Sequence, residues 1–120
     1  MTTAPIVIFY LAAAALGAYI LLLWFRRARR PTLIGLHLIL GAAALETLFA
    51  FMRNVDIDEH GRAHSLGFTA GCFMALAMFS GFCAQLLRNQ PKVVSNALLA
   101  THVGSGLAGF FIVLAFVSQL

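Results

Sequence analysis

Residues 21–31 read Leu-Leu-Leu-Trp-Phe-Arg-Arg-Ala-Arg-Arg-Pro, so an unbroken apolar run ends in four arginines and a proline. The run extends back to about Pro5 and so has the ~20 residues that an α-helix needs to cross a bilayer core of ~30 Å. A proline lacks a backbone N–H and is tolerated in the first turn of a helix, so Pro31 marks the start of a second helix. This stretch predicts a membrane hairpin, with two spans joined by a short basic turn.

The same arrangement recurs along the whole chain of 120 residues. Apolar segments of spanning length occupy residues 5–25, 33–52, 66–87 and 97–120, and a second basic connector, 88–92, joins the last two. Hydrophobic residues make up 62% of the chain and charged residues only 10%, whereas a soluble domain has charges at about a quarter of its positions. So few charges cannot cover a water-facing surface, and most of the chain is expected to lie in lipid.

In lipid, backbone N–H and C=O groups must be paired within the segment, which favours helices for continuous apolar runs that do not alternate. Short connectors make consecutive helices antiparallel neighbours. The sequence therefore predicts an all-α integral membrane protein, a four-helix up-down-up-down bundle that forms a single transmembrane domain over residues 1–120.

Basic residues gather in two of the three connectors. Six of the eight Lys and Arg residues lie within 26–31 and 88–92, whereas the middle connector, 53–65, has two and the residues before the first span have none. By the positive-inside rule, the two basic connectors face the cytoplasm and both termini face the other side. We expect a multi-pass protein of a bacterial-type inner (cytoplasmic) membrane, in which these charges set topology and meet lipid headgroups and do not bind nucleic acid.

Two histidines lie inside the apolar spans at nearly the same depth. His37 is seven residues after Arg30, and His102 is six residues after Asn96, the last strongly polar residue before the fourth apolar run. At 1.5 Å per residue, both imidazoles fall roughly 10 Å past the polar boundary. Spans two and four run in the same direction and lie diagonally across an up-down bundle, so the two imidazoles are placed to face each other.

Each of these histidines is followed four residues later by a glycine, Gly41 or Gly106. Residues i and i+4 share a helix face, so the glycine leaves room for a flat macrocycle beside the histidine. Two neutral imidazoles on different helices are what a bis-histidine b-type haem requires. Arg27 and Arg30 of the first basic connector are close enough in depth to pair with haem propionates. The pattern therefore predicts that both histidines ligate haem iron.

Other roles fit the same residues. Membrane histidines also bond to neighbouring helices, relay protons, or bind quinone or a metal, and glycines at helix interfaces are common packing residues. Glu46 lies nine residues after His37 and so points away from the histidine face. It is a candidate for a proton or quinone role, or for a structural hydrogen bond to a neighbour or partner subunit.

The middle connector has the spacing of a metal site. His60 and His64 are four residues apart, and the three acids Asp56, Asp58 and Glu59 precede them. Histidines at i and i+4 share a face where the chain is helical. A solvated acidic loop has the same composition, so both interpretations stay open.

The four-span outline, with histidines on different spans, resembles membrane cytochromes of the b561 type and related small haem-anchoring subunits. The resemblance covers the whole chain as an outline and implies haem b held between His37 and His102, with electron transfer as the function. Members of the family typically hold two haems on four histidines in the spans. This chain has only two histidines in its predicted spans, which limits the expectation to one haem.

Three functional hypotheses follow. The first is a b-type haem protein, or a haem-bearing subunit of a respiratory or photosynthetic complex, that passes electrons between quinone and a partner and has no catalytic residues of its own. The second is a cofactor-free accessory or assembly subunit. The third is a small oligomeric proton-coupled transporter that uses Glu46. A bundle this small buries little of its surface, so we expect a homo-oligomer or a larger membrane complex.

Overall fold

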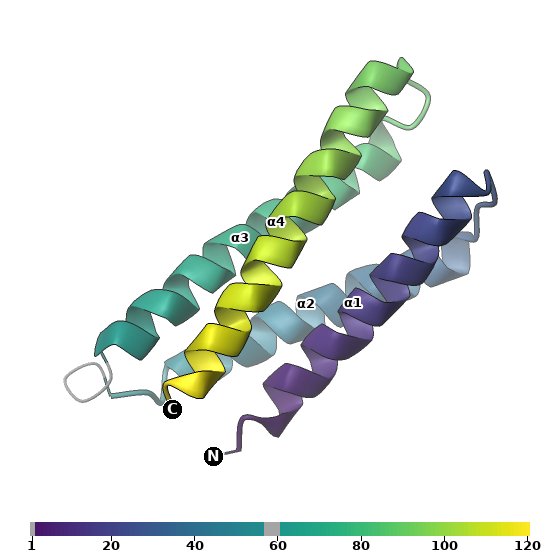
Figure 1. The fold of residues 1–120 in the computed structure, drawn as a ribbon. Coiled ribbons are helices and arrows are strands. Elements are labelled where there is room, and N and C mark those ends of the chain that lie inside the picture. The colour runs from purple at the N-terminus through teal and green to yellow at the C-terminus, as the bar shows by residue number, and fades with distance from the viewer. Residues whose placement is uncertain (1, 57–60) are drawn as a thin grey trace. The chain divides into compact units, whose positions relative to one another are not determined.

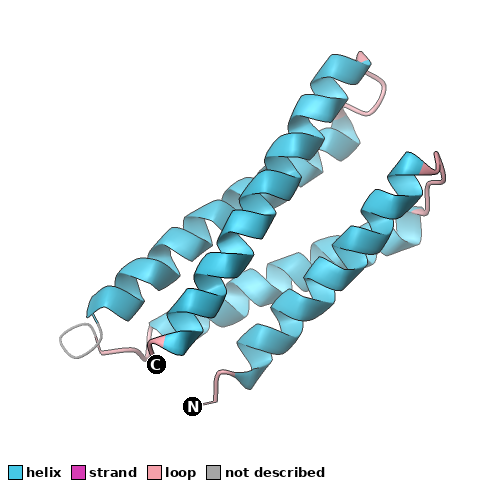
Figure 2. Cartoon of the chain, viewed as in Figure 1, coloured by secondary structure: helices cyan, strands magenta, loops and turns pink. Residues whose placement is uncertain are grey.

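The computed structural model describes residues 2–56 and 61–120, and the regular elements within them are four α-helices (Figure 1). These are α1 (Ala4–Phe25), α2 (Pro31–Met52), α3 (Gly61–Leu86) and α4 (Lys92–Ser118). The described residues contain no strand, as Figure 2 shows. All four helices are long and apolar enough to span a membrane. The all-α class with four membrane helices, predicted from the sequence, is confirmed.

Two helices begin earlier than the apolar composition suggests. α3 starts at Gly61 and α4 at Lys92, whereas the apolar runs start at residues 66 and 97. The polar first turns remain helical because the headgroup region accepts polar side chains while the backbone bonds continue. With 26 and 27 residues, these helices are about 40 Å long at 1.5 Å per residue, enough for the hydrocarbon core and the interface.

Internal contacts divide the chain into two compact units, residues 1–50 and 51–120. In the first unit, α1 and α2 form an antiparallel hairpin. Buried side chains recur every three or four positions along α1, at Ile6, Tyr10 and Ala13, and along α2, at Ala44 and Leu48. This spacing places the buried residues of each helix on one stripe, as helix packing requires.

The basic turn between α1 and α2 is closed by backbone hydrogen bonds. The amide of Ala28 donates to the carbonyl of Leu23 at 2.9 Å, and that of Arg27 donates to the carbonyl of Trp24 at 3.0 Å. These two bonds form a Schellman motif, which requires a left-handed residue just beyond the helix. Arg27 occupies that position, with φ of 54°, where glycine is the usual residue.

In the second unit, α3 and α4 pack closely through small residues. The buried residues of α3 are all small, and the adjacent residues of α4 include Ser105 and Gly109. A Cβ added at Gly109 would stand 2.5 Å from the Met74 sulfur. Such close approach of backbones is typical of helix pairs in lipid. The buried residues of α3 are Ala63, Gly67, Ala70, Gly71, Ala77 and Ser80.

The helix faces that point away from the α1–α2 and α3–α4 contacts have large apolar side chains. Phe25 is 74% exposed and Phe79 is 67% exposed. Several hydroxyl groups on the helices bond within their own helix, as where Thr101 Oγ1 donates to the Ala97 carbonyl at 2.9 Å. Exposed apolar faces, and helical hydroxyl groups that bond to their own backbone, suit a lipid solvent. The chain is therefore a multi-pass membrane protein in contact with lipid.

Candidate functional site

His37 of α2 packs against a glycine of α1. A Cβ added at Gly17 would stand 2.9 Å from Cε1 of His37 and 3.5 Å from each ring nitrogen. A real Cβ is almost never found at the shorter of these distances, so the imidazole occupies the space that any other residue at position 17 would fill. The ring is half-buried, and its Nδ1 atom is fully buried.

His102 of α4 packs in the same way against α3. A Cβ added at Gly81 would stand 2.6 Å from Nδ1 and 2.8 Å from Cε1 of His102. The Nδ1 atom also lies 2.6 Å from the carbonyl oxygen of Ala77. A carbonyl oxygen only accepts hydrogen bonds, so Nδ1 carries the proton and donates it.

This hydrogen bond leaves the other ring nitrogen of His102 with its lone pair. A neutral imidazole protonated at Nδ1 has an unprotonated Nε2, which is the form that binds a metal ion. Metal-bound histidines usually donate their second N–H to a carboxylate or a backbone carbonyl, which fixes the tautomer and the ring orientation. His102 is therefore held in the tautomer whose Nε2 could bind a metal ion.

The sequence did not single out Gly17 and Gly81. They lie on the first and third helices, whereas the histidines lie on the second and fourth. The detectable signal is the interval along the chain: His37 comes twenty positions after Gly17, and His102 comes twenty-one positions after Gly81. Each pair spans a basic connector, but His37 lies six residues after the start of α2 at Pro31, whereas His102 lies ten residues after the start of α4 at Lys92.

The two glycines predicted to flank the histidines have different surroundings. A Cβ added at Gly41 would meet nothing within 4 Å, so space is open beside that turn of α2. A Cβ added at Gly106 would stand 3.8 Å from the Cβ of Ala77. Gly106 thus lies on the side of α4 that packs on α3, consistent with the helix-packing alternative.

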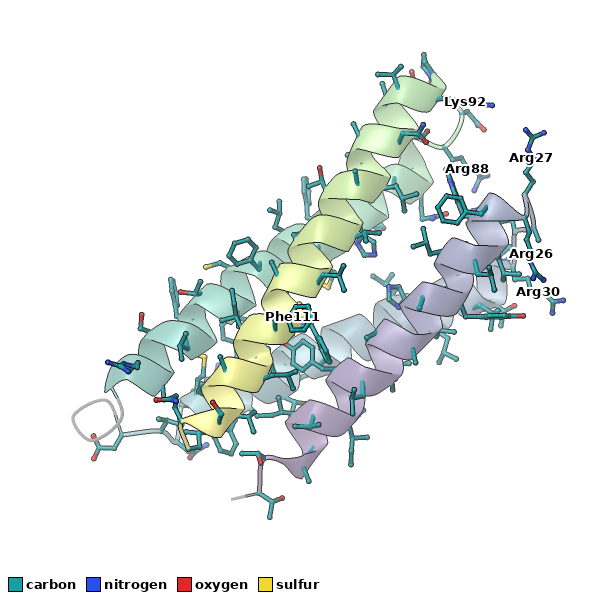
Figure 3. All side chains as sticks on the ribbon, viewed as in Figure 1. Arg26, Arg27, Arg30, Arg88, Lys92 and Phe111 are labelled. Carbon is teal, nitrogen blue, oxygen red and sulfur yellow. The ribbon has the colours of Figure 1, made fainter. Side chains whose placement is uncertain are left out.

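The charged candidates lie away from the buried stripes. Glu46 is exposed on α2, two residues from the buried Ala44 and Leu48, so it points away from the histidine face as expected. Arg27 and Arg30 are exposed at the turn between α1 and α2 (Figure 3).

The predicted metal site of the middle connector falls largely outside the described residues, since Asp58, Glu59 and His60 are not among them. His64 lies in the first turns of α3 and is half-buried. Within residues 2–56 and 61–120, no three His, Cys, Asp or Glu side chains are grouped to hold a metal ion.

Comparison with known proteins identifies the family. The family model described as eukaryotic cytochrome b561 matches residues 1–120. No curated protein and no solved structure matches the chain significantly. The family match spans the entire chain and agrees with four membrane helices. The chain belongs to the eukaryotic cytochrome b561 family, whose members are membrane proteins that transfer electrons with b-type haem.

Proposed function

We propose that this chain transfers electrons in a membrane through one haem b, with His37 and His102 as its axial ligands. The observation that carries the proposal is the 2.6 Å hydrogen bond from His102 Nδ1 to the Ala77 carbonyl. It directs the proton away from Nε2, the nitrogen that would bind iron. When bound between two imidazoles, haem supplies one-electron transfer, because neither axial position is left for a substrate.

The remaining residues have supporting roles in this proposal. Each histidine packs against a glycine of its own hairpin, which precedes it in the chain by twenty positions for His37 and by twenty-one for His102. Open space beside Gly41 suits a flat ligand next to α2. We assign Gly106 to the side of α4 that also contains His102, since both residues lie toward Ala77 of α3.

The basic connectors bear on both the cofactor and the topology. Arg27 and Arg30 are assigned to the haem propionates, because guanidinium groups bind carboxylates through paired hydrogen bonds. The charge bias puts both basic turns on the cytoplasmic side and both termini opposite. The bacterial-type inner membrane predicted from the sequence stays a prediction, since the matched family is described as eukaryotic.

The proposal treats residues 1–120 as one transmembrane domain, because one haem would need a ligand from each hairpin. Electrons would pass between a quinone-like small molecule and a partner protein, in a homo-oligomer or a larger membrane complex. The small size of the bundle and the exposed Glu46 support a partner surface.

The optical spectrum of the purified protein tests the proposal. We expect a Soret band, the sharp visible bands of reduced low-spin haem, and one haem per chain by pyridine haemochrome. His37→Ala and His102→Ala should each abolish the low-spin spectrum. Protein that takes up no haem, or a spectrum that survives both substitutions together, would contradict the proposed function.

A further inference from the structure

We infer that Gly17 and Gly81 are positioning residues for the two histidines, each setting the orientation of an imidazole on the neighbouring helix. The inference deepens the proposed function and rests on it, because it gives the two haem ligands a shared supporting device. It requires that the absence of a side chain at each glycine sets the orientation of the imidazole ring, and does not merely allow the two helices to approach closely.

Gly81 determines whether His102 reaches its hydrogen-bond acceptor. In a helix, the side chain of residue i+4 lies over the carbonyl of residue i, and Gly81 is four residues after Ala77. A Cβ at Gly81 would stand 2.6 Å from Nδ1, the same atom that donates to the Ala77 carbonyl at 2.6 Å. Any side chain at position 81 would therefore push the ring off this carbonyl.

Gly17 holds the His37 ring from the Cε1 side. The nearest ring atom to an added Cβ is Cε1, at 2.9 Å, with both nitrogens at 3.5 Å. An alanine at position 17 would press on the ring between its two nitrogens. The imidazole would have to rotate, which changes the direction of the nitrogen that binds iron.

The other glycines show that this contact is specific. Gly35 and Gly104 each lie two residues from a histidine, and a Cβ added at either would meet nothing within 4 Å. Gly109, on the α3–α4 seam, would meet Met74 and Phe73 instead. An added Cβ at Gly41, Gly61, Gly67 or Gly106 would likewise have no histidine atom among its nearest neighbours.

The first test needs no cofactor. Full-length protein labelled with [¹⁵N]histidine is purified in detergent without haem, and the ring nitrogens are observed by NMR. We expect His102 of the wild type to be protonated at Nδ1 and hydrogen-bonded. In Gly81→Ala, this resonance should shift toward the mixed tautomers of a ring in solution. An unchanged resonance in Gly81→Ala would overturn the inference for His102.

The second test adds haemin to the wild type, Gly17→Ala and Gly81→Ala, with Gly35→Ala and Gly104→Ala as matched controls. We expect both positioning variants to bind haemin about 10–100-fold more weakly, the usual effect of losing a partner that supports a metal ligand. Loss of the Nδ1–H bond makes His102 a weaker donor, so Gly81→Ala should also raise the midpoint potential. In Gly17→Ala, rotation of the ring should alter the low-spin EPR g values.

Gly109→Ala distinguishes a general loss of helix packing from a change in histidine orientation, because the added Cβ would contact Met74 and not a histidine. It is expected to lower the melting temperature but leave the potential and the g values as in the wild type. If Gly17→Ala and Gly81→Ala behave like Gly35→Ala and Gly104→Ala, the positioning role is wrong while the haem proposal stands. Wild-type protein that binds no haemin would instead overturn the proposed function itself.

Discussion

The Nδ1 atom of His102 lies 2.6 Å from the carbonyl oxygen of Ala77, on the helix that precedes it in the chain. The carbonyl is reachable because Gly81, one turn further along α3, has no side chain to cover it. A backbone group of one helix thus fixes the tautomer of an imidazole on the next. Substitution of Ala77 would not remove this carbonyl acceptor, so the hydrogen bond is best tested by substitution of the donor, His102, or of the residues around it.

Replacement of the ligand at position 102 should tune the redox potential. His102→Met removes the Nδ1–H donor and offers a thioether, and histidine–methionine ligation raises the potential of haem. We expect a higher midpoint potential in a redox titration of the reconstituted variant, with weaker haem binding. His64→Met, in the first turns of α3, is the control and should leave both the potential and the haem content unchanged. A lowered potential in His102→Met would contradict His102 as a ligand.

Glu46 should be dispensable for haem binding. Its side chain is exposed on α2 and lies away from the stripe that contains His37, Ala44 and Leu48. Glu46→Gln is expected to leave the haem content and the visible spectrum unchanged, whereas His37→Ala in the same helix abolishes the low-spin bands. A loss of haem in Glu46→Gln would show that this carboxyl group contributes to the site.

The Schellman turn offers a way to separate stability from cofactor binding at one residue. Arg27 has φ of 54°, and a non-glycine residue in that conformation costs roughly 1–2 kcal/mol. Arg27→Gly should therefore increase the free energy of unfolding of the haem-free protein by up to about 1 kcal/mol, measured by denaturant titration in detergent. Arg27→Ala keeps the cost and should not stabilise.

The same two substitutions test the assignment of Arg27 to a haem propionate. Both remove the guanidinium group, so both should weaken haemin binding to a similar extent in a spectroscopic titration. A hydrogen bond to a charged group contributes about 1.5–3 kcal/mol, which corresponds to roughly tenfold or more in affinity. Unchanged affinity in both variants would remove Arg27 from the proposed site.

Packing between α3 and α4 should depend on Gly109. A Cβ there would already stand 2.9 Å from Met74 Cγ and 3.3 Å from Phe73 Cβ, so a leucine cannot be accommodated without separating the helices. Gly109→Leu should lower stability by about 1–3 kcal/mol, the usual cost of an overfilled interior. Gly104→Leu, where an added Cβ would meet nothing within 4 Å, should have little effect on thermal unfolding followed by circular dichroism.

The sequence predicted the fold well because lipid leaves few alternatives. Apolar runs of spanning length between basic connectors specify helices, and the prolines at 31 and 91 mark where α2 and α4 begin. α3 and α4 begin before their apolar runs do, because composition changes at the edge of the hydrocarbon while backbone hydrogen bonding continues through the interface. A helix continues for as long as its backbone hydrogen bonds do, and a hydropathy pattern does not show where those bonds begin or end.

The candidate site was predicted only in part. His37 and His102 stand out because a histidine in an apolar run is rare. Gly17 and Gly81 do not, because a glycine among apolar residues in a membrane helix is common. Whether such a glycine contacts a histidine depends on which residue of the neighbouring helix lies opposite it. That alignment is set by how the two helices of the hairpin pack, which the sequence alone does not show. Gly106, which the sequence places on the histidine face, lies toward Ala77, the residue whose carbonyl His102 also contacts.

The division of the chain into two compact units has a consequence for assembly. Each hairpin contains one histidine of the proposed pair, so neither hairpin alone could supply both proposed ligands of the iron. In the proposed function, haem binding would therefore be linked to the association of the two hairpins, and part of its binding free energy would stabilise that association. The concentration of available haem would then set the fraction of chains in which the two hairpins are associated through the cofactor.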